Sequence, residues 1–361
     1  MIVTTLLPFL AVLASPALAR TSHPNTGANR RGLSHHQVAV EHARNVEKIN
    51  QAVERREELA QLNRRALENP IRRVQKRGAS GCRTAAPSST SSAAAAASSA
   101  AGSTSSSSSN SLTPNGIKAG LSAGDAFTAT ENHISWWYDW SPAPSGHSAS
   151  GITAVSMLWG DGHTGGQDAQ RLAEFQALSY SPSYIMGFYE PDCYPPMSSD
   201  IDPSTAAALW ESTIVPHRTN GGSTLLSPGM CKQKDETWLT PFKNAFSNPS
   251  SMWDITAIHV NKNSQTGVQE DIDYYWNTYG KPIWVTEFAC VDDSNGFVPC
   301  TDQGEINSFI NTVVPMFESD SRVYGYAYSN GEGLGDVWPM WINGALSESG
   351  QTYINAISAY H

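Results

Sequence analysis

The sequence is poor in charged residues and has little positive charge outside its first 77 residues. Only 16% of its 361 residues are charged, and residues 78–361 hold ten Lys and Arg against 27 Asp and Glu. Proteins that bind nucleic acid neutralise phosphates with a basic surface, so we expect no nucleic-acid partner for this acidic part. Anionic membrane surfaces are disfavoured for the same reason.

Long hydrophobic runs are also missing. The run Leu6–Leu18 is too short to span a bilayer, and it ends at Ala17-Leu18-Ala19, a small-x-small pattern that signal peptidase cuts. No later run is long enough to span, and residues 355–361 do not form an anchor signal. The sequence therefore predicts a signal peptide over residues 1–19 and a secreted protein, extracellular or associated with the cell wall, with no membrane partner.

Motifs for nucleotides and metals are absent as well. No G-x-G-x-x-G or G-x-x-x-x-G-K-[ST] follows a predicted strand, so a nucleotide-binding fold has no support. H-E-x-x-H does not occur, and no spacing of His, Cys and Asp is typical of a metal site. We therefore expect neither a metal nor a cofactor.

The N-terminal part divides by composition. Residues 20–77 carry 13 Lys and Arg against six Asp and Glu and close with Lys76-Arg77, a dibasic pair typical of a processed pro-segment. The alternative is a solvated, charged helix kept in the mature protein. Residues 78–113 are rich in Ser, Ala and Thr and are predicted to be a disordered linker, because they cannot bury enough apolar surface to offset their entropy. A single catalytic domain is left at residues 114–361.

The pattern of residues 114–361 predicts alternating strands and helices. Strands are expected at 117–122, 135–140, 154–159, 184–189, 224–228, 255–261, 282–288 and 323–329. Helices are expected at 167–178, 203–217, 236–246, 268–279, 303–318 and 351–360. Alternation of this kind is typical of an α/β fold with parallel strands, and eight strands in about 250 residues favour a (β/α)8 TIM barrel.

Two carboxylates end predicted strands. Glu190 follows Gly187-Phe188-Tyr189, and Glu287 follows Trp284-Val285-Thr286. Catalytic groups of such barrels lie at the carboxyl ends of the strands, so both side chains should meet at the mouth. One carboxyl that protonates a leaving oxygen, with a second that attacks the anomeric carbon or activates water, is what glycoside hydrolysis requires. A single Glu of this kind would more simply form an ion pair or cap a helix.

Aromatic side chains follow the same strands, and sugars stack their C–H faces on such rings. The candidates for substrate contacts are Trp137, Trp159, Tyr189, His259, Asn261, Tyr326 and Trp338. Successive residues of a strand face opposite sides, so only some of the rings line a groove and the others belong to the core. His259 ends its strand and is either a ligand of the substrate or a structural residue.

Five cysteines suit an oxidising compartment. The four in the predicted domain allow three pairings. We favour Cys290–Cys300, within the loop after the seventh strand, and Cys193–Cys231, which joins the loops after the fourth and fifth strands. Cys82 is left over before the linker and is either free or paired between chains.

Four stretches make the chain resemble a known family. Residues 135–142 (SWWYDWSP), 157–160 (MLWG), 187–192 (GFYEPD) and 284–290 (WVTEFAC) resemble the alkali-sensitive-linkage-type glycosyl hydrolases, glycoside hydrolase family 128. The resemblance covers residues 116–360 and implies a (β/α)8 barrel that cleaves β-1,3-glucan with retention of configuration. It implies that Glu190 is the general acid/base and Glu287 the nucleophile.

Two positions depart from that family. Tyr189 stands where the family usually has an asparagine that reaches the sugar 2-hydroxyl, and Val260-Asn261 replace the aromatic residues that commonly follow the histidine. The main interpretation is a secreted, monomeric, retaining β-1,3-glucanase that acts on a polysaccharide or oligosaccharide. The alternatives are the same chemistry on another β-glycan, or a wall-associated carbohydrate-binding protein with weak or lost catalysis.

Overall fold

The computed structural model describes residues 111–294, 296–330 and 333–361. The predicted signal peptide, the pro-segment, Cys82 and the linker up to residue 110 lie outside these residues. Within the described ranges, no helix combines the length and the apolar character needed to cross a membrane.

Nine short parallel strands form two sheets. The larger sheet has the order β3-β2-β1-β11-β8-β7 and the smaller one the order β4-β5-β6. The strands are β1 Ala119–Ser122, β2 Trp136–Tyr138, β3 Thr153–Ala154, β4 Ser156–Met157, β5 Tyr184–Met186, β6 Thr224–Leu226, β7 Thr256–Asn261, β8 Ile283–Ala289 and β11 Val323–Tyr328. The parallel α/β fold expected from the sequence is therefore present, and each predicted strand coincides with an observed one.

Two links join the sheets. The predicted strand 154–159 is divided into β3 and β4 around Val155, because its first half pairs with β2 and its second half with β5. A single parallel bridge between Leu226 and Ile255 joins β6 to the residue that precedes β7. The parallel pairings thus follow a cyclic order from β1 through β5 and β8 back to β1.

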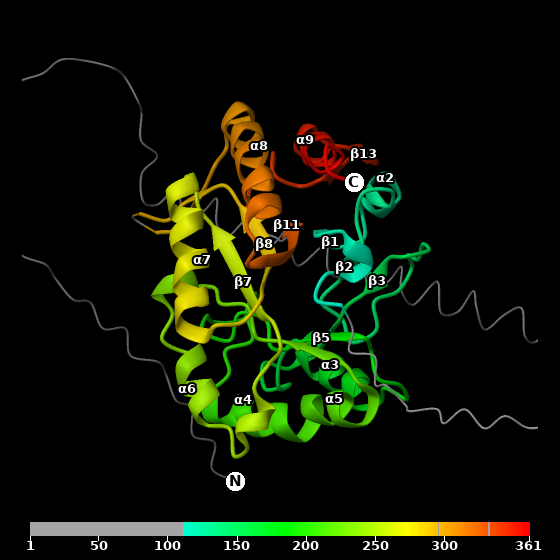
Figure 1. The fold of residues 1–361 in the computed structure, drawn as a ribbon, viewed down its shortest axis with the longest axis vertical. Coiled ribbons are helices and arrows are strands. Elements are labelled where there is room, and N and C mark those ends of the chain that lie inside the picture. Colours follow the sequence, from blue (N-terminus) through cyan, green and yellow to red (C-terminus); the bar gives the residue numbers. More distant parts are fainter. Residues whose placement is uncertain (1–110, 295, 331–332) are drawn as a thin grey trace, which may run out of the picture. The chain divides into compact units, whose positions relative to one another are not determined.

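Helices follow most of the strands and pack around them (Figure 1). They are α2 Phe127–Thr130, α3 Gly166–Gln176, α4 Pro203–Leu209, α5 Val215–Gly221, α6 Leu239–Asn244, α7 Gln265–Tyr279, α8 Gln303–Ser319 and α9 Glu348–Ile357. Asp202 accepts hydrogen bonds from Ser204 N and Thr205 N at the start of α4, and Asp302 accepts from Glu305 N at the start of α8. These caps satisfy N–H groups that have no partner within the helix.

Two predicted helices differ from the expectation. The helix expected at 203–217 continues as α4, the π-helical turn η2 (Trp210–Ile214) and α5, and Pro216 lacks the N–H that a regular helix needs there. The helix expected at 236–246 begins only at Leu239. Glu236 lies before the helix instead of inside it. Its carboxylate accepts hydrogen bonds from Trp238 N and Leu239 N, two N–H groups at the start of the helix.

The core has two layers. An inner cluster lies between the strands, and an outer cluster lies between strands and helices. Glycines on neighbouring strands make room for the largest inner rings: a Cβ at Gly120 would lie 2.2 Å from Trp136, and one at Gly325 would lie 2.8 Å from Trp284. The inner cluster contains Trp136, Tyr138, Val155, Met157, Trp159, Tyr184, Met186, Leu226, Ile255, Ala257, Trp284 and Ala327.

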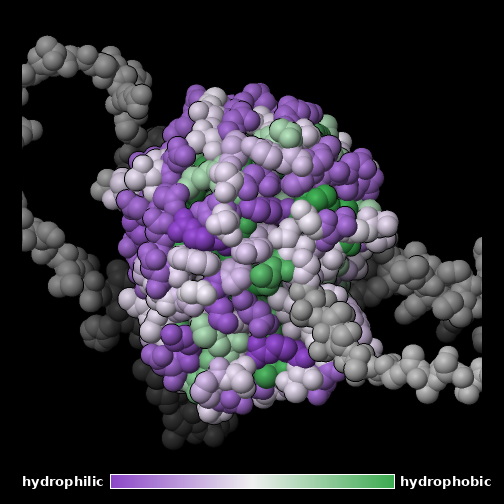
Figure 2. Space-filling model, in the orientation of Figure 1, coloured by the Kyte–Doolittle hydropathy of each residue, from purple (hydrophilic) through white to green (hydrophobic). Residues whose placement is uncertain are grey.

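Two small antiparallel hairpins follow β8 and β11, and the sequence did not predict them. They are β9 (Val291–Asp292) with β10 (Val298–Pro299), and β12 (Trp341–Ile342) with β13 (Ala345–Leu346). On the face shown in Figure 2, apolar residues form small separate patches among hydrophilic ones.

Candidate functional site

Glu287 lies on β8 in a buried position with a full set of hydrogen-bond donors. Its side chain is 5% exposed. The Oε1 atom accepts from the Tyr138 hydroxyl at 2.8 Å and from Trp140 Nε1 at 3.2 Å, and Oε2 accepts from the Ser329 hydroxyl at 2.9 Å. Burial and then the charge of Glu287 raise the pKa of Tyr138 well above its ordinary value, so the phenol stays a donor. The carboxylate is therefore held in one orientation by three donors from the ends of two strands, β2 and β11.

Glu190 lies beyond β5, where the chain turns out of the sheet. Its φ of 46° is in the left-handed region, which a side chain with a Cβ adopts only at some cost. Two interactions hold this turn: Glu190 N donates to Gly229 O, and Cys193 N donates to Glu190 O, both at 3.1 Å. The side chain is 16% exposed, so Glu190 is more open to solvent than Glu287.

His259 connects the two carboxylates. It is the register partner of Glu287 in the β7–β8 ladder, and its Nδ1 atom lies 2.9 Å from Glu190 Oε1. Burial alone would lower the pKa of His259, but the charges of Glu287 and Glu190 outweigh that effect and raise the pKa above its ordinary value. The second oxygen of Glu190, Oε2, accepts from the Ser198 hydroxyl at 2.9 Å. Both oxygens of Glu190 are thus engaged by neighbours.

Tyr189 faces both carboxylates. Its ring is stacked on Trp159 with 6.2 Å between centroids, and it contacts the rings of His259 at 5.5 Å and Trp140 at 6.4 Å. Burial first, and then the charges of Glu287 and Glu190, raise the pKa of Tyr189 well above its ordinary value. The Tyr189 phenol is thus affected by both negative charges, and it lies beside the space between the two carboxyl groups.

Trp159 and Asn261 lie at the edge of this group. Trp159 is 6% exposed, with the Arg171 guanidinium carbon 5.4 Å from the centroid of its ring. Asn261 is the last residue of β7 and lies two positions after His259, so both point to the same face of the strand. Among the predicted contacts, the structure therefore brings Trp159, Tyr189, His259 and Asn261 toward the two Glu residues.

Three predicted contacts are wrong, because their rings belong to the outer core. Trp137 packs edge-on against Phe127 and lies beside His147. Tyr326 points toward α8, where its hydroxyl donates to Glu318 Oε1 at 2.7 Å. Trp338 is stacked on Tyr328 and donates to Ser329 O. None of the three is more than 1% exposed, so they support the site from behind and cannot touch a ligand.

Four residues of the site were not among the predicted contacts: Tyr138, Trp140, Ser198 and Ser329. Tyr138 is one of several rings on its strand, and the sequence alone does not distinguish it from Trp136 and Trp137. Its orientation follows from Gly120, since a glycine on the neighbouring strand leaves space for Trp136, and Tyr138 points the same way as Trp136. The two serines carry no signal in the sequence, because only the fold brings them to the carboxylates.

The loops around the site are braced covalently. The structure contains the two disulfides favoured from the sequence, Cys193–Cys231 and Cys290–Cys300. Beside the first, the Asp192 carboxylate accepts from Cys231 N at 2.9 Å and from Lys232 N at 3.0 Å. The loop that follows Glu190 is thereby tied to the loop after β6.

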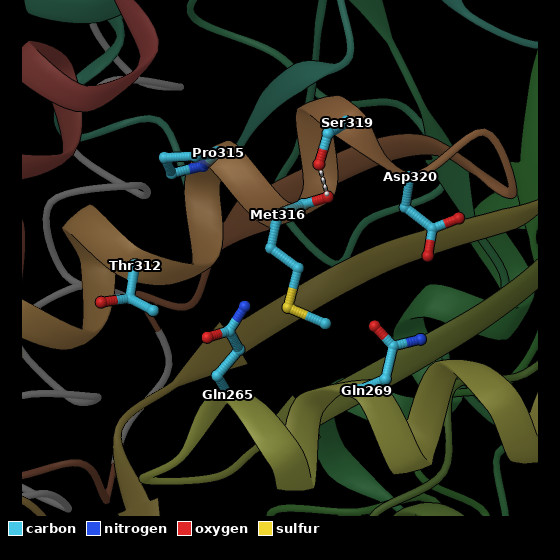
Figure 3. Close-up of a pocket in the computed structure, with 7 residues that line it drawn as sticks. All are labelled: Gln265, Gln269, Thr312, Pro315, Met316, Ser319 and Asp320. Carbon is cyan, nitrogen blue, oxygen red and sulfur yellow. Dashed lines mark hydrogen bonds between the residues drawn. The ribbon is translucent and has the colours of Figure 1, made fainter.

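A separate pocket of about 410 Å³ lies on the helical layer, between α7 and α8 (Figure 3). Met316 points into it from α8, opposite Gln265 and Gln269 of α7. Its single carboxylate, Asp320, is already paired with Arg322. The pocket contains none of the predicted site residues, so the carboxylate pair remains the better functional candidate.

Comparisons with known proteins show the family of the chain. The family model described as "Glycosyl hydrolase catalytic core" matches residues 116–353. A solved oligosaccharide-binding protein of glycoside hydrolase family 128, subgroup VII, from Cryptococcus neoformans is 59% identical; the match covers 70% of this chain and 98% of that protein, with a TM-score of 0.67. A subgroup II endo-β-1,3-glucanase from Sorangium cellulosum is 25% identical over 66% of this chain and 98% of its own, with a TM-score of 0.54.

One curated relative is longer than this chain. Alkali-sensitive linkage protein 1 of Schizosaccharomyces pombe is 29% identical over 244 residues, which is 65% of this chain and 43% of the relative. The chain thus spans less than half of the length of that relative.

Proposed function

Because the chain belongs to the glycosyl hydrolase catalytic-core family, and within it to glycoside hydrolase family 128, we propose that its site binds β-1,3-linked gluco-oligosaccharides and hydrolyses them slowly or not at all. The observation that carries this proposal is the position of Tyr189. Its ring lies beside both carboxylates, where the family pattern has an asparagine. The strong likeness to a protein described as oligosaccharide-binding supports the same conclusion.

The physical argument concerns the sugar ring at the cleavage point. Glu287 and Glu190 would have to approach the anomeric carbon and the leaving oxygen from opposite sides. The Tyr189 ring packs against Trp140, Trp159 and His259, the rings beside the two carboxyl groups, and so competes for that space. The change also removes an amide, and hydrogen bonds to the 2-hydroxyl that strengthen in the transition state supply several kcal/mol in this reaction class. The protein therefore keeps its affinity for the sugar units beside the cleavage point, whereas the transition state of hydrolysis loses a stabilising hydrogen bond.

The remaining surroundings suit a carbohydrate ligand. The rings of Trp159 and Trp140 lie at the same mouth as Glu190 and Asn261, so apolar faces and polar groups meet there. Aromatic surface with a few polar groups is the usual composition of a small-ligand site. We include in this proposal that the cyclic strand order represents one closed (β/α)8 barrel, with the site at its carboxyl-terminal mouth.

Retaining hydrolysis at an enzymatic rate is the second candidate, and one observation favours it. Both carboxylates are present, and Glu287 is oriented by three donors. In this mechanism Glu287 forms a covalent glycosyl intermediate while Glu190 protonates the leaving oxygen, and water then releases the sugar with Glu190 as base. A protein that only binds has no need of so well supported a nucleophile.

Secretion and attachment to a cell wall remain part of the proposal. Two disulfides among the described residues are consistent with an oxidising compartment. A glucan ligand of this linkage would be met outside the cell, where the predicted signal peptide would deliver the chain.

Calorimetry and product analysis on the same samples test the proposal. The full chain is titrated with a β-1,3-linked pentaglucoside and, as a specificity control, with its β-1,4-linked counterpart. We expect binding of the first only, with no release of shorter sugars over many binding lifetimes. Trp159→Ala should weaken binding at least about tenfold, or 1.4 kcal/mol. Trp276→Ala, which removes a partly exposed ring from α7, should leave binding unchanged.

Replacement of Tyr189 separates the two candidates. Tyr189→Asn should increase cleavage of β-1,3-glucan at least about tenfold, because it clears the space beside the carboxylates and restores an amide. Tyr189→Phe serves as the control, since it keeps the ring. Rapid cleavage by the unmodified protein would overturn the binding proposal in favour of the hydrolase. Absence of any binding to β-1,3-glucosides would overturn both.

A further inference from the structure

We propose that the loop between Trp159 and α3, together with the first turn of α3, holds a binding site for one divalent transition-metal ion, with Asp161, His163 and Asp168 as its ligands. The ligand atoms of these three residues lie within 4.8 Å of one another. This site is separate from the carboxylate pair of Glu190 and Glu287, and the spacing of residues in the sequence gave no expectation of it.

Asp161 and His163 already form one half of the site. The Asp161 Oδ1 atom accepts from His163 N at 3.1 Å and lies 2.5 Å from His163 Nδ1. The His163 side chain is 45% exposed, so an ion can reach it from solvent. An imidazole and a carboxylate that face each other at this distance can share a cation in place of the proton between them.

Asp168 supplies the observation that points to a ligand. The residue is only 3% exposed, and its Oδ1 atom is buried without any hydrogen-bond partner. The other oxygen, Oδ2, accepts from Thr164 N at 3.2 Å and from the Thr164 hydroxyl at 2.9 Å. The two hydrogen bonds from Thr164 therefore account for Oδ2 and leave Oδ1 without a partner. A buried carboxylate oxygen without a donor is costly, and a bound cation would compensate it.

Glycines shape the loop around this carboxylate. A Cβ at position 160 would lie 2.3 Å from Asp168 Oδ1, so only glycine permits the close approach of the loop to that oxygen. Gly162 lies between Asp161 and His163 with a φ of +84°, a conformation that L side chains rarely adopt. Together these positions let the loop and the first turn of α3 direct three potential ligands at a common point.

The donor set indicates the class of metal. One imidazole and two carboxylates are ligands that Zn²⁺ accepts, and three protein ligands leave a fourth position for water or another oxygen. Calcium needs six to eight oxygen ligands, and magnesium requires near-octahedral oxygen coordination, so both fit these residues less well.

Other charges around the loop are balanced. Arg171 lies close enough to Asp168 to interact with its charge, and Asp200 adds a negative charge near His163. Arg171 donates no hydrogen bond to the orphan oxygen, since that atom has no partner. No protein group therefore occupies Asp168 Oδ1, which stays able to bind an ion directly. The carboxylates of Asp161 and Asp168 keep this region negative enough to attract a cation. An ion bound there would tether the residues that directly follow Trp159.

The test measures metal binding alone, with no sugar present, so that its outcome is independent of the proposed function. The full chain is stripped with a chelator, dialysed and titrated with ZnCl₂ by calorimetry, and Co²⁺ absorption reports the coordination. Histidines near the N-terminus, such as His35 and His36, give a background that every variant shares. The measured quantity is therefore the difference between variants.

Asp161→Asn and His163→Gln should each remove one equivalent of bound Zn²⁺ or lower the affinity for it at least about 100-fold. Loss of a residue that only supports a ligand already costs up to about 100-fold, so loss of a ligand should cost at least as much. His361→Gln is the matched control, because His361 faces only one carboxylate, that of Glu318. It should bind as the unmodified protein does. Zn²⁺ should raise the melting temperature of the unmodified protein more than that of either loop variant. Equal stoichiometry, affinity and thermal shift in all four proteins would overturn the proposal.

Discussion

The two strand ends that carry the carboxylates are built in different ways. Glu287 lies within β8, directly after a register shift in the pairing with β7, and three donors, Tyr138, Trp140 and Ser329, orient it. Glu190 lies outside β5, on a turn with positive φ, and its partners are His259 from a neighbouring strand and Ser198 from its own loop. The sheet determines the position of the Glu287 carboxylate, whereas the structure of a loop determines the position of the Glu190 carboxylate.

This difference explains where the chain tolerates change. A strand residue surrounded by packed neighbours moves only with the whole sheet, but a loop residue depends on the contacts of a few positions. The disulfide Cys193–Cys231 and the two hydrogen bonds of Asp192 replace, for the Glu190 loop, what strand pairing does for Glu287. Changes that release these loop contacts should affect Glu190 first.

The largest expected effect compares the two carboxylates directly. In the Tyr189→Asn background, Glu287→Gln should abolish turnover on every substrate, a loss of about a thousandfold or more, because no covalent intermediate can form. Glu190→Ala should keep more activity on an activated aryl glucoside, whose leaving group needs little protonation, and added azide should yield a β-glycosyl azide. Rates with each substrate and mass spectrometry of the products provide the measurement. Equal losses for both variants on both substrates would contradict the assigned roles.

The disulfides give the next largest effect. Loop closure predicts a loss of unfolding free energy of about 4 kcal/mol for Cys193→Ala with Cys231→Ala, and about 3 kcal/mol for Cys290→Ala with Cys300→Ala, since the bridged segments span 38 and 10 residues. Only the first pair should also weaken oligosaccharide binding, because it secures the Glu190 loop. Urea unfolding and calorimetry measure the two quantities. If the second pair weakened binding more than the first, the contrast between the two loops would fail.

The serine donors provide a smaller contrast. Ser329→Ala should cost about 1.5–3 kcal/mol of unfolding free energy, because a buried charged oxygen of Glu287 loses its donor. Ser198→Ala should cost less, about 0.5–1.5 kcal/mol, because the more exposed Glu190 can bind water instead. Urea unfolding of both variants ranks them. The reverse order would show that Glu190 is the more tightly held carboxylate.

The smallest effect concerns His259, which links both carboxylates. Its pKa in the folded protein is raised above the ordinary 6.5, so its contribution to stability is fully present below about pH 6.5 and is lost as the pH rises through the raised pKa. The melting temperature should therefore fall more between pH 6 and pH 8 for the unmodified protein than for His259→Gln.

The difference between the two proteins isolates His259 from other titrating groups. Burial raises the pKa of Asp271 to about 7, which also lowers stability as the pH rises from about 4 to 7, but this group is present in both proteins. Parallel profiles for the two proteins would show that the imidazole carries no charge between the carboxylates.

Much of the architecture could be predicted because it depends on local signals. Asp202 with Pro203 and Asp302 begin helices wherever they precede a helical pattern, since their side chains satisfy free N–H groups nearby. The carboxyl ends of parallel strands lie at the same edge, so Glu190 and Glu287 could be assigned to one end of the strands before any coordinates. The sequence does not predict where a strand is interrupted when the interruption depends on strands far away in the chain. Val155 is an example, because the chain changes its pairing from β2 to β5 there.

What the sequence by itself determined was the set of strand ends and the pair of carboxylates on them. Only the tertiary structure decided which rings accompany that pair. Strands of a parallel sheet are covered on both faces, so Trp136, Trp137 and Tyr138 are all aromatic and all buried, and alternation cannot say which of them faces inward. The register with Gly120 settles that choice for Tyr138, and the same long-range packing brings Ser198, His259 and Ser329 to the carboxylates. Contacts between residues so far apart in the chain form only in the folded protein.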